Sequence, residues 1–169
     1  MNLTGTRTIN ADLATVWAGL LDAEVLKACV PGCTEMTGSP DEGFEATVTQ
    51  KVGPVKATFK GAVQLSDMVP HQSLTMTGEG KGGAAGFAKG GANVTLADSG
   101  DGVVLNYDVE AKVGGKLAQL GSRIIDGFAR KMADQFFENF QAAVEPAEPE
   151  TDEAPAPDAP KKGWFRRKG

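Results

Sequence analysis

Few side chains in this sequence could act together as acids, bases or nucleophiles. The single histidine, His71, follows Pro70 in a segment whose residues favour a turn. A Ser-His-Asp triad, a Cys-His dyad or a histidine-rich metal site would each have to be built around this one turn residue. Glu45, Asp108 and Glu110 fall on the polar phase of alternating segments, which directs them towards water. The sequence therefore predicts no catalytic residue and no metal site, and it disfavours an enzyme.

The two cysteines, Cys29 and Cys33, give equally little indication of chemistry. Their C-x-x-x-C spacing differs from the C-x-x-C of thiol exchangers, and no second ligand pair for zinc follows. A small free cysteine is commonly a buried apolar residue. Reduced, buried thiols are the favoured interpretation, and redox chemistry is the weaker alternative.

A glycine-rich string at residues 78–83 has the letters of a dinucleotide-binding fingerprint, with Asp98 about twenty residues further on. That fingerprint needs a helix that begins at the glycines. The following Gly86, Gly90 and Gly91 would each destabilise such a helix by about 1 kcal/mol. Nucleotide binding is therefore disfavoured, and two interpretations stay open: the glycines permit bends and bulges in a strongly curved sheet, or they leave room for a ligand.

The C-terminal residues 161–169, KKGWFRRKG, combine five positive charges with two adjacent aromatic side chains. A basic residue near an anionic leaflet contributes about 1 kcal/mol, and tryptophan favours the membrane interface. The pattern predicts reversible membrane binding; a solubilising basic end, or docking on an acidic protein, is the alternative. The predicted membrane-binding residues are Lys161, Lys162, Trp164, Phe165, Arg166, Arg167 and Lys168.

Length and composition predict one domain with an appendage. A chain of 169 residues fits one ordinary domain, and its net charge of -5 argues against a nucleic-acid partner. Residues 1–9 lack the basic and apolar regions of a secretory signal, which predicts a cytoplasmic protein. No apolar run approaches the 18 or more residues of a membrane span, so membrane association would be peripheral, on the inner face of the cell membrane.

The sequence pattern changes along the chain from a strand to two short helices and then to a series of strands, and these elements must position any site. Residues 1–9 alternate as a strand does, Asn10 offers a cap to a first short helix, and Asp22 begins a second that Pro31-Gly32 ends. Residues 34–112 show period-two runs between turn residues, which predicts about six antiparallel strands. The predicted breaks are at residues 39–43, 53–54, 69–71, 78–91 and 98–102.

The last predicted element is a long amphipathic helix, on the order of 40 Å, that could lie across the whole sheet. Its apolar stripe comprises Leu117, Leu120, Ile124, Ile125, Phe128, Met132, Phe136, Phe137, Phe140 and Val144. The chain therefore divides into a domain over residues 1–144, an acidic, proline-rich disordered linker over 145–160, and the basic-aromatic tip over 161–169.

Several local strings carry a resemblance to a known family. They are Val30-Pro31-Gly32-Cys33, Lys51-Val52-Gly53-Pro54-Val55-Lys56-Ala57, Gly78-Glu79-Gly80-Lys81, and the run VGGKLAQLGSR at residues 113–123. With the order of elements, they resemble the START-like, helix-grip superfamily and, within it, the CoxG family of carbon monoxide dehydrogenase subunits. The resemblance implies an α+β helix-grip fold, in which a curved antiparallel sheet wraps around a long C-terminal helix and two short helices follow the first strand.

The resemblance also implies a function. Members of this family are expected to be non-catalytic accessories of molybdenum hydroxylases such as aerobic carbon monoxide dehydrogenase, linked to the membrane and to quinone reduction. We therefore expect a carrier of a lipophilic ligand, menaquinone or a similar quinone, between the membrane and the dehydrogenase. Two alternatives stay open: a docking or maturation factor with a filled core and no ligand, and, more weakly, an enzyme acting on a small apolar substrate.

The ligand would lie between the sheet and the last helix. On sequence alone the apolar stripe of that helix is better explained as filled core, and the resemblance is what favours a partly hollow interior. The residues predicted to grip the ligand are Phe59, Val63, Met76, Phe87, Leu105, Tyr107, Leu120, Ile124, Phe128 and Met132.

Overall fold

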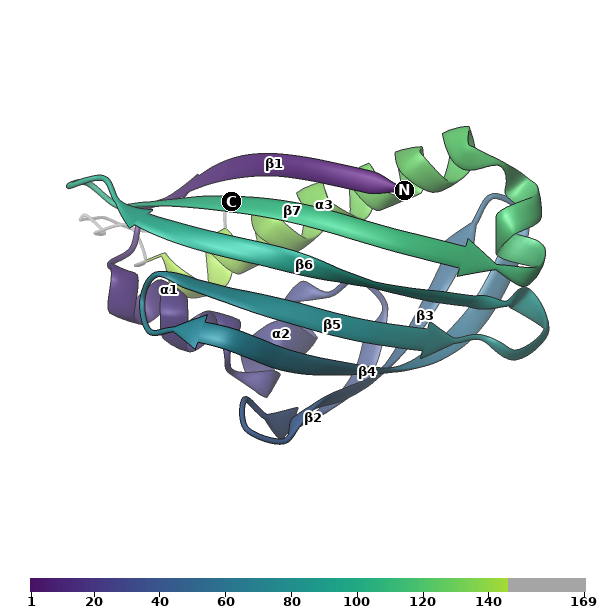
Figure 1. The fold of residues 1–169 in the computed structure, drawn as a ribbon, viewed down its shortest axis with the longest axis horizontal. Coiled ribbons are helices and arrows are strands. Elements are labelled where there is room, and N and C mark those ends of the chain that lie inside the picture. The colour runs from purple at the N-terminus through teal and green to yellow at the C-terminus, as the bar shows by residue number, and fades with distance from the viewer. Residues whose placement is uncertain (146–169) are drawn as a thin grey trace, which may run out of the picture.

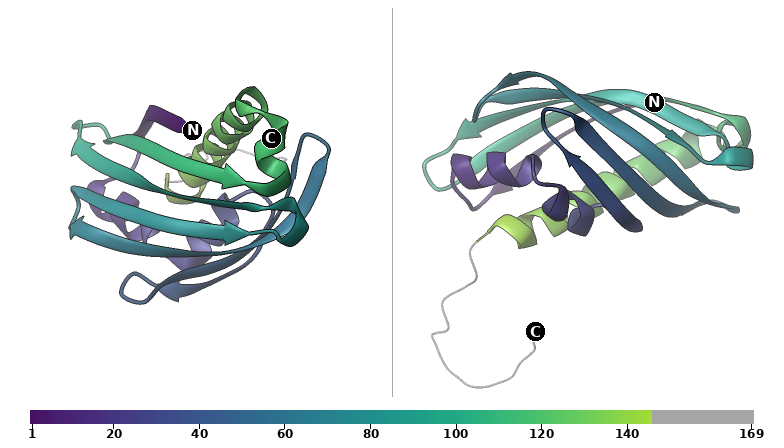
Figure 2. Two further views of the ribbon diagram at one scale, coloured as in Figure 1. Left: turned by 45° about the vertical axis from the view of Figure 1, so that its right-hand side comes forward. Right: turned by 90° about the horizontal axis from the view of Figure 1, so that it is seen from below.

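The computed structural model describes residues 1–145, which form one antiparallel sheet with helices on one of its faces (Figures 1 and 2). The strands are β1 (Asn2–Ile9), β2 (Cys33–Ser39), β3 (Gly43–Val52), β4 (Val55–Val69), β5 (Ser73–Lys81), β6 (Phe87–Asp98) and β7 (Val103–Gly114). The helices are α1 (Leu13–Leu20), α2 (Ala23–Cys29) and α3 (Ser122–Val144), with 3₁₀ turns η1 (Gly83–Ala85) and η2 (Gly115–Leu120).

The sheet is an open meander of β2 to β7, and β1 forms the edge strand beside β7. Its order is β1-β7-β6-β5-β4-β3-β2, so β2 to β6 each pair with the strand that follows in the chain, and β7 pairs with β1. Alternation along each strand gives one face that is apolar and one that is polar. Figure 2 shows the sheet curving over α3, with α1 and α2 on the same side. The predicted α+β architecture, with six strands after the two short helices and a long last helix, is confirmed.

Short polar residues begin the first two helices. Asp12, and not Asn10 as predicted, caps α1: its carboxylate accepts a hydrogen bond from the Thr15 amide at 2.7 Å. This bond lowers the pKa of Asp12. The Asn10 amide instead donates to the carboxylate of Glu145 at 2.9 Å. Asp22 caps α2, as predicted.

The last helix begins later than predicted. Residues 115–120 form the 3₁₀ turn η2, and Gly121, with φ of +90°, separates this turn from α3. A positive φ is easily adopted only by glycine, so the helix cannot continue smoothly through this position. Leu117 and Leu120 therefore lie outside the helix. The 23 residues of α3 correspond to about 35 Å.

The glycine cluster was predicted to form a break, but most of it lies within strands. Gly78 and Gly80 belong to β5, and Gly90 and Gly91 belong to β6, while the connecting turn occupies residues 82–86. The pairing of β5 with β6 runs from Ser73–Thr95 to Lys81–Phe87 without a register shift. No β-bulge therefore accompanies these glycines in this pair of strands.

The cysteines are both free. Cys29 is fully buried in the main core, and burial raises the pKa of its thiol. Cys33 is half-buried, and its Sγ donates to the Glu35 carbonyl at 3.1 Å. For Cys29 the expected role as a small buried apolar residue is confirmed.

Candidate ligand-binding cavity

An apolar cavity of about 380 Å³ lies between the sheet and the first half of α3. A second hollow of about 420 Å³ adjoins it over β3 to β6 and shares six of its lining residues, so the two are continuous. The first cavity is lined by Met1, Leu3, Val48, Gln50, Val52, Phe59, Gly80, Ala88, Val109, Ala111, Val113, Leu117, Ile125, Phe128, Ala129, Met132 and Ala133.

The cavity exists because the sheet presents small residues to this part of the helix. Gly80 is paired with Gly61 on one side and with Ala88 on the other, so three adjacent strands contribute almost no side-chain volume. A Cβ atom built on Gly80 would meet no other atom within 4 Å. On α3, Ala129 and Ala133 also line this space. The open interpretation of the glycines, room for a ligand, is the one that this geometry supports.

The other half of the sheet is filled. Leu74, Val94 and Leu105 are buried there beneath the second half of α3, together with Phe137 and Phe140. Tyr107 stacks on Phe137 with the ring centroids 4.9 Å apart. The tyrosine ring lies over Gly5, where a Cβ would approach the tyrosine hydroxyl to 2.3 Å.

Hydrogen bonds also hold this second half of α3. Asn139 donates from Nδ2 to the Cys29 carbonyl at 3.0 Å, and Gln141 donates from Nε2 to the Thr8 carbonyl at 2.9 Å. Asp134 pairs with Arg7, whose guanidinium carbon lies 5.6 Å from the Phe137 ring centroid. The helix is therefore fixed at its C-terminal end and spans the cavity at its N-terminal end.

Five of the ten residues predicted to grip a ligand lie where a ligand would need them. Phe59, Phe128 and Met132 line the first cavity, and Val63 and Met76 line the adjoining hollow. The Phe59 ring lies over Gly82, where a Cβ would be 2.4 Å from it. The structure thus brings together side chains from β4, β5 and α3.

The other five predicted positions require correction. Leu105 and Tyr107 belong to the filled half. Leu120 lies on η2 and packs against the small cluster around Leu117 without lining the cavity. Phe87 is 38% exposed on the outer face of the sheet, because its neighbour Ala88 is the residue that faces the helix. Ile124 is 42% exposed, because the helix turns Ile125 inward instead.

The residues that the sequence reasoning missed are mainly small or adjacent to those that it chose. Ala129 and Ala133 follow Ile125 at intervals of four residues, which is a helical face that the search for large side chains overlooked. Val52, Leu117 and Ile125 form a small buried cluster that closes one end of the cavity.

The lining of the first cavity is almost wholly apolar. Gln50 is the one lining residue with a polar side chain, and its Nε2 donates to the Pro31 carbonyl. The lining side chains include no acid, base or nucleophile, and residues 1–145 hold no group of three or more potential metal ligands. Glu45, Asp108 and Glu110 are exposed, as predicted. The cavity has the size and apolar lining to accept an apolar molecule, and the Met1 ammonium at its border donates to the Ala111 carbonyl at 2.9 Å.

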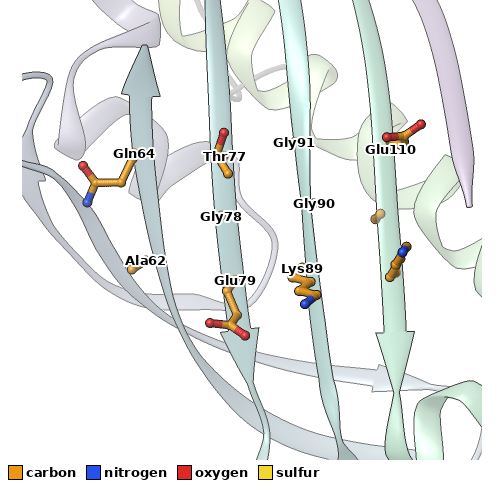
Figure 3. A pocket seen from close by; sticks show the side chains of 11 residues that line it. Ala62, Gln64, Thr77, Gly78, Glu79, Lys89, Gly90, Gly91 and Glu110 are labelled. Carbon is orange, nitrogen blue, oxygen red and sulfur yellow. The ribbon is translucent and has the colours of Figure 1, made fainter.

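A larger hollow, of about 680 Å³, lies on the opposite face of the sheet and has a different character. Figure 3 shows Gln64, Thr77, Glu79, Lys89 and Glu110 around it, at positions that alternate with the residues facing α3. These side chains are exposed and polar. Such a surface does not suit a lipophilic ligand.

The predictions about the C-terminal segment fall largely outside the described residues. Helix α3 ends at Val144, and the Glu145 carboxylate accepts hydrogen bonds from the Asn10 amide and from Gln141. The remainder of the predicted linker and the whole predicted membrane-binding tip lie in residues 146–169, which the structure does not describe. Among residues 1–145, no helix is long and apolar enough to cross a bilayer.

Solved structures place this architecture in a known class. A START superfamily protein from Mycobacterium smegmatis matches with a TM-score of 0.63 at 14% identity, covering 85% of this chain and 96% of that one. A conserved protein from Geobacillus kaustophilus matches with a TM-score of 0.79 at 25% identity, covering 85% and 95%. A protein from Chromobacterium violaceum matches with a TM-score of 0.63 at 18% identity, covering 87% and 99%. The fold is START-like, as predicted.

Within this class, the sequence identifies a family. The family model for CoxG, a subunit of carbon monoxide dehydrogenase, matches residues 5–145, and the chain belongs to this family. No curated protein sequence matches the chain. Membership of this family relates the chain to carbon monoxide dehydrogenase.

Proposed function

We propose that this protein carries a lipophilic ligand, menaquinone or a similar quinone, between the membrane and a cytoplasmic molybdenum carbon monoxide dehydrogenase or related hydroxylase. The observation that supports carriage is the apolar space above Gly80, where an added Cβ would touch nothing. Close packing is the rule in protein interiors, so a domain of this size would ordinarily fill such a space. A factor that only recruits the dehydrogenase would have no use for it.

The size of the space suits part of a quinone. At about 380 Å³, the first cavity is near the lower end of the range for small-molecule sites. A ring system with the beginning of an isoprenoid chain would occupy it, and the chain would continue into the adjoining hollow of about 420 Å³. Neither space has a charged side chain directed into it from the concave face, which favours a neutral ligand.

Delivery requires contact with the membrane, for which residues 161–169 are our proposed device. Their five positive charges and the Trp164-Phe165 pair would attach reversibly to the inner, anionic leaflet of the cell membrane. Residues 146–160 would act as a spacer, so that the carrier could reach the dehydrogenase without leaving the surface. No metal or covalently bound cofactor forms part of this proposal.

The direct experiment is organic extraction of the purified full-length protein followed by mass spectrometry. We expect a quinone at close to one equivalent per chain. After delipidation, added quinone should restore that ratio, and the loaded protein should accept electrons from reduced dehydrogenase. A protein that yields no lipid and takes up none would reject carriage in favour of the recruiting role.

A further inference from the structure

Three pairs of lysines lie directly opposite each other on neighbouring strands at one end of the sheet. The pairs are Lys51–Lys56 across β3 and β4, Lys60–Lys81 across β4 and β5, and Lys89–Lys112 across β6 and β7. All six side chains are exposed. Like charges in direct cross-strand pairs are destabilising, so stability alone does not explain this repeated arrangement.

The positive charge continues onto the elements that follow β7. Lys116 lies on η2, and Arg123 lies in the first turn of α3, where no acidic residue offsets the positive end of the helix dipole. With the three pairs, these are eight of the twelve lysines and arginines in residues 1–145. The one ion pair within that part of the chain is Arg7–Asp134, so none of the eight forms a salt bridge there, although Glu79 lies directly opposite Lys89 across β5 and β6. We call this the basic end; it lies at the right of Figure 1.

The opposite end of the sheet carries the reverse charge. Asp98 and Asp101 flank the turn between β6 and β7, Asp67 lies next to the turn between β4 and β5, and Asp12 and Asp22 cap α1 and α2. The chain has a net charge of -5, yet eight of the twelve lysines and arginines in residues 1–145 are gathered at one end. A protein with this asymmetry turns its basic end towards a negatively charged surface.

Apolar side chains are exposed at the basic end, and the cavity lies just behind them. Ile124 is 42% exposed, and it lies with Leu120 against Gly53, at 3.8 Å from the position of a Cβ on that glycine. Behind these residues, the small buried cluster of Val52, Leu117 and Ile125 closes the cavity. A thin layer of side chains thus separates the basic surface from the apolar interior.

We propose that the basic end docks on an anionic phospholipid bilayer and is the passage through which the ligand enters the cavity. This inference rests on the proposed function, since it states where the carrier is loaded. Basic residues are attracted to an anionic leaflet, and Ile124 would reach the acyl boundary between them. A lipophilic molecule that enters here avoids the unfavourable contact of its apolar surface with water.

The test uses an environment-sensitive fluorophore on the full-length protein at two matched positions. In a Cys33→Ser background, which leaves only the buried Cys29, the label is attached to Ile124→Cys or to Met68→Cys. Met68 is 36% exposed at the acidic end and serves as the control. With quinone-free vesicles containing phosphatidylglycerol, we expect a blue shift and increased emission at position 124 and no change at position 68. Vesicles of phosphatidylcholine alone should change neither.

Charge variants then test whether the basic residues cause the binding to anionic vesicles. Adding Lys56→Glu and Lys81→Glu to the protein labelled at position 124 should weaken its response to anionic vesicles at least tenfold. Lys27→Glu, at an exposed position on α2, should have little effect. Thermal unfolding of each variant checks that the fold is retained.

Three results would overturn the proposal. Position 124 could fail to respond although the protein sediments with vesicles, which would leave binding to residues 161–169 alone. Both labels could respond equally, or position 124 could respond only to added dehydrogenase, which would make the basic end a protein-binding surface. Because the vesicles contain no quinone, a negative result in the vesicle experiment does not affect the extraction experiment. A protein that docks on vesicles but yields no lipid on extraction would reject carriage and retain the docking surface.

Discussion

The two halves of the space beneath α3 differ although the same strands and the same helix build both. Over the second half of the helix, the sheet contributes Leu74, Val94 and Leu105, which are all buried and in contact. Over the first half, it contributes Gly80 and Ala88 at the equivalent inward-facing positions. In both halves, inward-facing and outward-facing residues alternate along the strands, and β5, β6 and β7 pair without interruption. The difference shows that side-chain size at a few inward positions decides whether a sheet-and-helix interface becomes a core or a cavity.

The filled half also carries the contacts that hold the helix. Three side chains of α3, Asp134, Asn139 and Gln141, bond to β1 or α2, and all three lie in its second half. The first half has apolar contacts with the cluster around Leu117 and Val52. Stability should therefore reside mainly in the filled half, and capacity for a ligand in the other.

The largest expected contrast comes from two phenylalanine truncations on the same helix. Phe140→Ala should lower the free energy of unfolding of delipidated protein by about 3 to 5 kcal/mol, because this ring is fully buried among close neighbours. Phe128→Ala should lower it by about 1 to 2 kcal/mol, because Phe128 already borders empty space. Urea denaturation measures both. Equal losses would mean that the two halves are packed alike.

A smaller contrast comes from two inward-facing glycines on adjacent strands. A Cβ on Gly90 would lie 2.0 Å from the Glu110 carbonyl oxygen, so Gly90→Ala should destabilise the protein by about 1 to 3 kcal/mol. Gly80→Ala meets nothing within 4 Å and should raise the free energy of unfolding by about 0.4 to 1 kcal/mol, since alanine restricts the unfolded chain. Destabilisation by Gly80→Ala in thermal and urea unfolding would contradict the cavity.

The smallest expected effect concerns the ion pair of the filled half. Asp134→Asn removes the charge that faces Arg7, but the aspartate side chain is 60% exposed, so the loss should be about 0.5 kcal/mol. Raising the salt concentration should reduce the difference between this variant and the parent. A loss of several kcal/mol would show that the pair, and not apolar packing, is what holds the helix.

Much of the fold could be predicted from periodicity. The strands from residue 34 onward alternate cleanly, because one face of the sheet is exposed to water and the other faces the helix. The boundary of α3 could not be read in this way, since Leu117 and Leu120 continue the helical spacing across Gly121. Only the backbone shows the positive φ that stops the helix there. Of the residues predicted on this helix, Phe128 and Met132 line the cavity, whereas Ile125 takes the place predicted for Ile124.

The site depends on cross-strand register, which composition does not contain. Gly80 and Gly91 are alike in the sequence, yet pairing directs Gly80 towards α3 and places Gly91 beside the outer hollow. The same holds for the paired lysines of the basic end, which are scattered over some sixty residues and meet only through strand pairing. Residue types could suggest a spacious interior, but they could not show which glycine lines the cavity between the sheet and α3.

The most direct measurement is the equilibrium binding of a short-chain naphthoquinone to delipidated protein carrying Gly80→Leu. The new side chain would project into the empty space above the sheet, so we predict that the parent binds one equivalent and that Gly80→Leu binds at least tenfold more weakly while still folding. Ala97→Leu, which adds the same bulk at an exposed position on β6, should bind as the parent does. Undiminished binding by a folded Gly80→Leu protein would contradict the claim that this cavity holds the ligand.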